Sequence, residues 1–416
     1  MINKDPSSIA HKTPSVGLTD IEAPLDLLRM RQYRLGRVRE QLKANDCAAA
    51  LLIDPINVRY AIGSKGCCPI FQTHLPCGYV FVATEGPVVA FGGVAHKERV
   101  IGLGTVTECR PAVSLTYFQS GPRLPESINV WAGELASLFK SCAGGNKRLA
   151  VDRLDVACAT ALGSHGIKLF DAQGPIELAR SIKSAEEILC MNYSLSVSEV
   201  GMARMREALR PGLTENELFS ILAQTNIAMG GEWMECKILT SGDRTNPWFQ
   251  ASNDRRIRPG ELLSFDTDMV GPFGYCADVS RTFFCGPGRP SDEQRKLYKL
   301  AYEEIQHNAS LVKAGVSFRE LTEKSYRQAD EYIANRYQLL AHGIGLCDEY
   351  PSIYYRQDVE KMGFDGVFEE NMTICIESYV GAEGGKQGVK LEHQLLVTTN
   401  GCEILSKFPF EEELLR

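Results

Sequence analysis

The sequence lacks several features that would each indicate a particular class of protein. It has no run of about 18 apolar residues, the length that a membrane-spanning helix requires. Residues 1–24 are polar and contain prolines, with no apolar core of the kind found in secretion signals. The 14 cysteines include no Cys-x-x-Cys pair, so a zinc ribbon and a thioredoxin-type motif are excluded.

An excess of positive charge is also missing. The 45 basic residues are outnumbered by 52 acidic ones, which gives a net charge of -7. Nucleic acids and anionic membrane surfaces both select proteins with a cationic face, so we expect neither as a partner. A long chain with scattered cysteines is typical of free thiols in a reducing compartment. The sequence therefore predicts a cytoplasmic protein.

What the sequence does contain fits a folded protein of two domains. Hydrophobic residues make up 44 % of the 416 residues and charged residues 23 %, an ordinary balance for a globular protein. We expect an N-terminal arm over 1–24 and a first domain over 25–178, in which strands and helices alternate in the α/β manner. A second domain over 179–416 combines helices with mostly antiparallel strands, an α+β arrangement.

Helix starts in the second domain are marked by a recurring signature. Thr214 to Glu217 and Ser291 to Gln294 both have the form of a capping box, which predicts a helix after each. Five strands are expected near these helices, over 232–240, 262–268, 276–284, 373–379 and 389–397.

Acidic residues recur on or beside these strands. Asp266 and Asp268 are two residues apart, so the strand period places both on one face. A turn at 270–274 then returns the chain antiparallel and can bring Asp278 close to Asp268. Further along lie His342, Glu377 and Glu392. One acid on a strand is usually solvated, but five acids that converge out of water require cations. Oxygen ligands with one imidazole suit two ions of Mn, Fe, Co or Zn.

The segments that carry these residues resemble a known family. Residues 261–284, 342–351, 371–379 and 390–401 are similar to the metal-binding blocks of the creatinase, aminopeptidase P, prolidase and methionine aminopeptidase (M24) family. The resemblance implies a creatinase-like N-terminal domain over 25–178 and a "pita-bread" catalytic domain over 179–416. It also implies a homodimer, and two divalent or trivalent metal ions held by Asp266, Asp268, Asp278, His342, Glu377 and Glu392.

Two departures from the peptidase pattern change the expected activity. The loop 241–249 has no histidine where the peptidases carry one, and Asp348 replaces the second histidine of the His-Gly-x-Gly block. The same departures resemble the branch of the family formed by the DddP-type lyases of dimethylsulfoniopropionate (DMSP). That resemblance implies iron as the favoured metal, Asp348 as the catalytic base and Tyr337 beside the substrate. His393 departs from this pattern too, since an acid usually follows the glutamate.

The implied reaction places chemical demands on the site. Cleaving DMSP to dimethyl sulfide and acrylate removes a proton α to a metal-bound carboxylate, so a carboxylate base must reach that proton. Aromatic faces hold a sulfonium cation best, which makes Trp248, Phe249, Trp233 and Tyr350 candidates. Two alternatives remain open at this stage. One is a metallohydrolase of the same fold acting on an X-Pro peptide or small amide, and the other is a catalytically silent binding protein.

Overall fold

The computed structural model describes residues 24–65, 75, 78–93, 96–100 and 102–416. Its contacts divide the chain into two compact units. The N-terminal unit comprises residues up to 169 together with 184–189, and the C-terminal unit comprises 170–183 and 190–416. The predicted arm over 1–24 lies almost wholly outside the described residues. No helix among the residues described is both long and apolar enough to cross a membrane.

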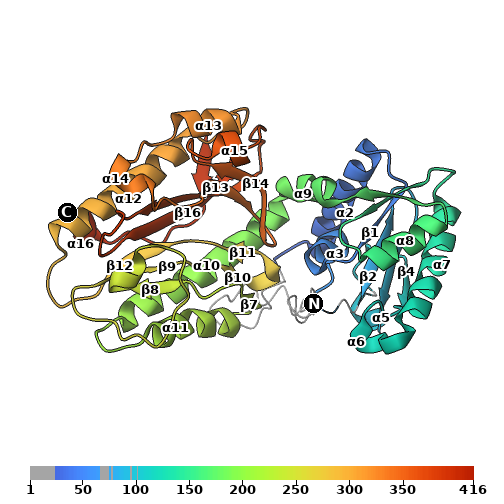
Figure 1. The fold of residues 1–416 in the computed structure, drawn as a ribbon, viewed down its shortest axis with the longest axis horizontal. Helices are drawn as coiled ribbons and strands as arrows, with labels where there is room; N and C mark the ends of the chain where they lie inside the picture. The colour runs from blue at the N-terminus through green and yellow to red at the C-terminus, as the bar shows by residue number, and fades with distance from the viewer. Residues whose placement is uncertain (1–23, 66–74, 76–77, 94–95, 101) are drawn as a thin grey trace, which may run out of the picture. The chain divides into compact units, whose positions relative to one another are not determined.

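The N-terminal unit is built on a sheet of six strands in the order β4-β3-β2-β1-β5-β6. Strand β1 pairs antiparallel with β2 and parallel with β5. Helices α7 and α8 share one hydrophobic core with the strands, and α2 and α3 pack on the other side of the sheet (Figure 1). The strands are β1 (Ala49–Leu52), β2 (Tyr79–Ala83), β3 (Val88–Gly92), β4 (Glu108–Pro111), β5 (Arg148–Val151) and β6 (Lys168–Asp171). The helices are α2 (Leu27–Ala44), α3 (Pro55–Ile62), α5 (His96–Val100), α6 (Tyr117–Ser120), α7 (Leu124–Cys142) and α8 (Val156–Ser164).

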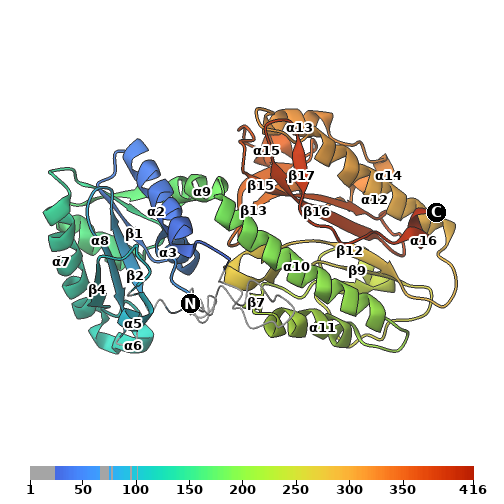
Figure 2. The same ribbon diagram turned by 180° about the vertical axis from the view of Figure 1, so that it is seen from behind.

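The C-terminal unit has two halves, each with its own core. One core joins α12 and α13 to the five-stranded antiparallel sheet β14-β13-β15-β16-β17. The other joins α10 and α11 to the sheets β12-β9-β8 and β11-β10-β7. Figures 1 and 2 show these helix pairs on opposite outer sides, with the strands between them. Polar side chains on the inner strands therefore face one another across the middle of the unit.

The helices of this unit are α9 (Gln173–Ser181), α10 (Ala185–Ala208), α11 (Glu215–Ala228), α12 (Asp292–Leu311), α13 (Phe318–Lys324), α14 (Asp330–Ile333), α15 (Val359–Met362) and α16 (Glu412–Leu415). The strands are β7 (Trp233–Met234), β8 (Leu239–Ser241), β9 (Leu262–Phe265), β10 (Met269–Val270), β11 (Cys276–Ala277), β12 (Arg281–Phe284), β13 (Leu339–Ile344), β14 (Asp348–Tyr354), β15 (Thr373–Val380), β16 (Val389–Val397) and β17 (Cys402–Ile404).

Both predicted capping boxes are present, at Thr214 before α11 and at Ser291 before α12. Strand β16 has the predicted bounds, and β15 is one residue longer than expected. Three of the predicted strands are wrong in their extent. The strand expected over 232–240 is broken into β7 and β8. The strand expected over 262–268 ends at Phe265, and the one expected over 276–284 is broken into β11 and β12. The last two interruptions fall at the aspartates, which leave the regular ladder and turn toward the centre of the unit.

Candidate metal centre

The pairing of three strands brings three of the predicted ligands together. On β15 and β16, Glu377 is directly opposite Glu392. On β13, His342 is opposite Cys375, which lies two residues from Glu377 and so on the same face of the sheet. The glutamates are 1 % and 0 % exposed and the histidine 5 %, so all three are removed from water.

A glycine allows the close approach of β14 to His342. The register between β13 and β14 shifts between His342 and Gly343. A Cβ atom on Gly343 would lie 2.3 Å from the carbonyl oxygen of Tyr350, far inside the van der Waals limit. A glycine at this position therefore permits the close contact between the two strands.

The aspartates reach the same place by a different route from the one expected. Asp266 and Asp268 both lie beyond the end of β9, and Asp268 has a φ of 34°, so the strand period does not place them. The residue between them positions both instead. Thr267 donates a hydrogen bond to the carbonyl of Ala277 (2.8 Å) and accepts one from the amide of Val279 (3.0 Å). The predicted antiparallel return of the chain is confirmed, since Met269 pairs with Ala277 and Asp278 follows.

The six predicted ligands converge. The imidazole Nε2 of His342 lies 3.2 Å from Glu377 Oε1, 3.5 Å from Asp278 Oδ2 and 3.8 Å from Glu392 Oε1. Three sets of donor atoms each lie within 4.8 Å of one another: Asp266, Asp268 and Asp278; Asp266, Glu377 and Glu392; and Asp278, His342, Glu392 and Cys375. Because Asp266, Asp278 and Glu392 each belong to two sets, neighbouring ions could share them.

One cation of the protein already lies in this cluster. The ammonium of Lys390 donates to Glu377 Oε2 (2.8 Å) and to Asp266 Oδ2 and Glu392 Oε2 (both 3.2 Å). It also donates to the hydroxyl of Ser280 at 2.7 Å. Sequence reasoning missed this residue, although the strand period that places Glu392 inward also places Lys390 inward.

Lys390 does not satisfy the whole cluster. The oxygens Asp278 Oδ1, Glu377 Oε1 and Glu392 Oε1 are buried and have no hydrogen-bond partner among the residues described. Burial, followed by the charges of Glu392 and Asp266, raises the pKa of Asp278 well above its usual range. Burial raises the pKa of Glu392 to about 8 against the opposing effect of Lys390. Burial and then Asp266 raise the pKa of Asp268 to about 8. A cation site typically has buried oxygens without protein partners, and its carboxylates have raised pKa values when no cation is counted. These residues show both features, so they fit metal ions.

A cavity of about 670 Å³ opens over the cluster. Asp266, Asp268, Asp278, His342 and Glu377 line its inner part, and Trp248, Phe249 and Tyr337 supply aromatic rings to its wall. The Phe249 and Tyr337 rings are 6.5 Å apart, and the Lys390 ammonium lies 4.8 Å from the Tyr337 ring centre.

Two of the expected substrate contacts are not among the residues that line this cavity. Trp233 lies on β7, where it pairs with Val270 of β10. Tyr350 stacks on Phe364 at 5.5 Å and contacts the edge of Phe318 at 5.8 Å. An aromatic residue close in sequence to a site residue can still pack against other parts of the fold. Neither Trp233 nor Tyr350 is in the cavity lining.

Asp348 lies in the cavity wall beside the cluster. Its Oδ1 is 3.6 Å from His342 Nδ1, and its side chain is 63 % exposed. Loss of surrounding water raises the pKa of Asp348, an effect that His342 opposes and the charge of Glu377 reinforces. The next residue, Glu349, is buried in ion pairs with Lys183 and Arg180, and these anchor the strand that carries Asp348.

Two further cavity residues were not anticipated. Cys236 donates its thiol hydrogen to Asp268 Oδ2 at 2.6 Å. Glu235 lines the same wall, and burial together with the charge of Asp348 raises its pKa to about 7. Neither lies within a segment whose pattern pointed to chemistry, so only the fold brings them into the site.

Comparison with known proteins identifies the family. Residues 190–399 match the model of metallopeptidase family M24. The chain belongs to metallopeptidase family M24. Enzymes of family M24 use divalent metal ions, and the acidic cluster is where this chain could hold them.

The chain is 35 % identical to the "dimethylsulfoniopropionate lyase DddP" of Roseovarius nubinhibens, over 94 % of this chain and 88 % of the relative. It is 34 % identical, with the same coverage, to the protein of that name from Roseobacter denitrificans. The resemblance to the DddP-type branch is thereby confirmed, and the chain is an enzyme.

Solved structures share the fold. An Xaa-Pro dipeptidase from Bacillus anthracis superposes with a TM-score of 0.75 at 22 % identity, covering 92 % of this chain and 99 % of the other. A prolidase from Pyrococcus horikoshii gives a TM-score of 0.72 at 21 % identity, covering 91 % and 99 %. The predicted fold class, with a pita-bread catalytic domain in the C-terminal part, is confirmed. At this level of identity the likeness concerns the fold alone.

Proposed function

We propose that the protein is a metal-dependent carbon–sulfur lyase that cleaves DMSP to dimethyl sulfide and acrylate. The observation that carries the proposal is the position of Asp348: an exposed carboxylate in the wall of a cavity whose inner part is the acidic cluster. The near full-length likeness to two relatives named DMSP lyase supports the choice of substrate.

Asp266, Asp268, Asp278, His342, Glu377 and Glu392 would hold two metal ions, as the sequence analysis expects. When bound, such ions supply positive charge beside the substrate carboxylate, which makes the α proton more acidic. Lys390 holds the outer oxygens of three of these carboxylates, so it fixes their orientation toward the cavity.

Asp348 acts as the base. Its carboxylate accepts the α proton, the electron pair of that C–H bond forms the new carbon–carbon double bond, and the Cβ–S bond breaks with its electrons passing to sulfur. The products are acrylate and neutral dimethyl sulfide. A raised pKa makes Asp348 a stronger base than an ordinary aspartate, and its exposed position lets it reach a substrate in the cavity.

The aromatic wall suits the other end of the substrate. Trp248, Phe249 and Tyr337 line the cavity, and a sulfonium cation is attracted to the faces of aromatic rings. Phe249 is 67 % exposed, which leaves its ring available to a ligand. Trp233 and Tyr350 are dropped from the proposed contacts because they lie elsewhere.

Hydrolysis of an X-Pro peptide is the second candidate, and the likeness of the fold to prolidases favours it. The cavity argues against it. Of the residues described, His342 is the single histidine in its lining, and it belongs to the proposed ligands. The proton-handling histidines expected for peptide hydrolysis therefore have no counterpart in the described lining.

Three finer points belong to the same proposal. We favour iron as the metal on the resemblance to the DddP-type branch, with zinc, manganese and cobalt as alternatives. We also propose a homodimer, on family likeness, and a cytoplasmic location, on the composition of the sequence.

Headspace analysis of dimethyl sulfide over metal-quantified enzyme tests the proposal. Asp348→Asn should reduce release of the sulfide by about 10²- to 10⁴-fold, the usual contribution of a general base, and leave metal content unchanged. Asp155→Asn, a change at an exposed helix start in the N-terminal unit, serves as the matched control and should retain full activity. Release of dimethyl sulfide by Asp348→Asn at the wild-type rate would exclude this base, and X-Pro cleavage without sulfide release would favour the hydrolase.

A further inference from the structure

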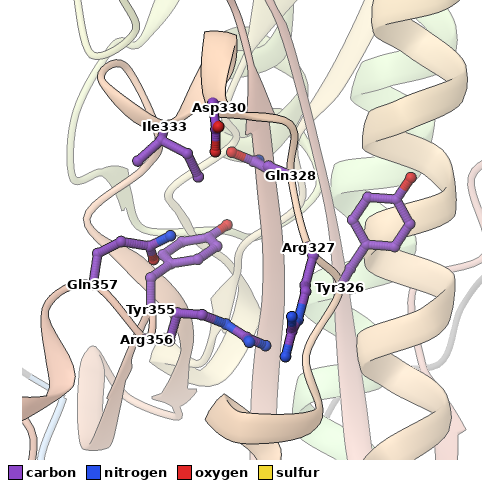
Figure 3. A pocket seen from close by; sticks show the side chains of 8 residues that line it. All are labelled: Tyr326, Arg327, Gln328, Asp330, Ile333, Tyr355, Arg356 and Gln357. Carbon is purple, nitrogen blue, oxygen red and sulfur yellow. The ribbon is translucent and has the colours of Figure 1, made fainter.

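A second cavity, of about 190 Å³, lies behind the loop that leads to Tyr337. Two stretches of chain form it: residues 326–333, which follow α13, and residues 355–357, which follow β14. Figure 3 shows the side chains of Arg327 and Arg356 at one end of this pocket, with the Tyr355 ring beside them and Asp330 and Ile333 beyond. The proposed lyase mechanism makes no use of this pocket.

The two guanidinium groups are held in different ways. Arg356 is anchored on one side, because its Nη2 donates to the carbonyls of Glu323 and Ser325, both at 3.0 Å. Its Nε and Nη1 have no acceptor among the residues described, which leaves three N–H donors available. Arg327 is exposed and makes no hydrogen bond or ion pair within the described part of the chain.

The pair carries uncompensated charge. The side chains of Arg327 and Arg356 lie next to each other (Figure 3), and burial and then the charge of Arg327 lower the pKa of Arg356. Glu323 partly offsets this, and Asp330 lies at the opposite end of the pocket (Figure 3). Paired guanidinium groups with free N–H donors bind carboxylate and phosphate oxygens in a bidentate manner.

One continuous segment of chain links the pocket to the active cavity. Residues 326–333 line the second cavity, and the same segment continues into residues 334–339, which line the first and include Tyr337. Arg336, within residues 334–339, is fixed by a bidentate ion pair with Asp358 at 2.6 Å. Asp358 directly follows the pocket residue Gln357. A ligand held by Arg327 would therefore restrain the segment that positions Tyr337.

We propose that this pocket is an effector site for a small oxyanion, a carboxylate or a phosphate, that acts on the active cavity through residues 326–339. Binding of the anion does not depend on the lyase assignment. The effect on the active cavity rests on the proposed function, because it is measured as a change in lyase activity.

Arginine-specific labelling with phenylglyoxal, followed by mass spectrometry of the peptides, tests binding at this position. Metal-loaded protein is labelled alone, with inorganic phosphate and, separately, with acetate. A ligand at nine-tenths occupancy should slow labelling of Arg327 about tenfold, and the anion that does so identifies the source. Arg289, an exposed arginine in the loop before α12, is the control and should be labelled at the same rate throughout. Labelling of Arg327 that neither anion slows, or slowing that is equal at Arg289, would overturn the proposal.

Kinetics test the effector role. The protecting anion should change KM for DMSP in the wild type, and Arg327→Gln should abolish that change while its KM without anion stays normal. Arg327 is the better position to substitute, since Arg356 also caps α13. Protection of Arg327 with no change in KM would refute the effector role. A preparation without any lyase activity would instead count against the proposed function, and the labelling result would still decide binding.

Discussion

Strand β15 separates two groups of buried carboxylates that are stabilised in different ways. On one face, Glu304 of α12 is completely buried, and neutral donors satisfy both of its oxygens: Ser378 at 2.5 Å and Gln328 at 2.7 Å on Oε2, and Tyr355 at 3.2 Å on Oε1. On the other face, Glu377 and Glu392 are equally buried, but each keeps one oxygen without a partner among the described residues. A buried acid whose oxygens all accept hydrogen bonds from neutral donors has a structural role. Several buried acids whose oxygens lack partners indicate a cation-binding site instead.

The acidic cluster is also only partly neutralised by the protein. Five predicted carboxylate ligands surround one ammonium, that of Lys390, and one imidazole. Although burial alone would lower the pKa of His342, the charges of Asp348 and Glu377 raise it well above its usual range. Lys390 contacts three of the five carboxylates and His342 adds Asp278, so two basic groups face five acids. The alternative in which each acid is paired with its own basic residue therefore fails.

The largest expected difference is between two variants, each of which replaces one buried acid on one face of β15 by its amide. Glu392→Gln removes a charge that two proposed ion sites share, and activity should fall by roughly 10³-fold, equivalent to about 4 kcal/mol of transition-state stabilisation. Glu304→Gln, the matched change on the other face, should retain metal and activity. Elemental analysis alongside headspace sulfide measurement decides this. Equal loss of metal in both variants would mean that the two faces do not differ as proposed.

Removing the metal should have the next largest effect. A ligand present at 100 times its Kd stabilises the folded state by about 2.7 kcal/mol, and for a unit of this size each kcal/mol shifts Tm by about 2–4 °C. Treatment with a chelator should therefore lower Tm by about 5–10 °C in the wild type and in Glu304→Gln. Glu392→Gln should show little response. A Tm that the chelator leaves unchanged in all three proteins would argue against a resident ion.

The pH dependence of stability should differ between the metal-free and metal-loaded proteins. Asp268 and Glu392 have pKa values of about 8 without metal, above their ordinary values of 3.8 and 4.5. Between these limits the folded state binds more protons than the unfolded state, so stability is highest at low pH and is lost as the pH rises through 8. Urea unfolding from pH 5.5 to 8.5 should show this decline in metal-free protein. Metal should flatten it, and a slope identical in both states would contradict the assignment.

The sequence predicts this site better than it predicts the way the site is built. Capping boxes and the apolar pattern of β15 and β16 are local signals, so those helices and strands were anticipated. Asp268 was assigned to a strand, yet it has a positive φ beyond the end of β9, a tertiary arrangement imposed by Thr267. The strand period places Lys390 on the same face as Glu392, but a lysine two residues from a predicted ligand usually reaches solvent, so the sequence does not predict its role. Trp233 and Tyr350 show that residue type alone does not tell which way a side chain faces.

The smallest expected effect concerns the stability of Glu304→Gln. Burial raises the pKa of Glu304 to about 7, so at pH 6 the acid is largely neutral and an amide resembles it closely. The amide oxygen can accept from Gln328, and its N–H can donate to the hydroxyl of Tyr355, which is able to act as an acceptor. We therefore expect the free energy of unfolding to match the wild type within about 1 kcal/mol at pH 6. At pH 9 the wild type must keep an ionised carboxylate away from water, so the variant should be the more stable of the two. Denaturant unfolding at both values checks the sign, and a variant that is less stable at pH 9 would show that the charge of Glu304 is itself held by a cation.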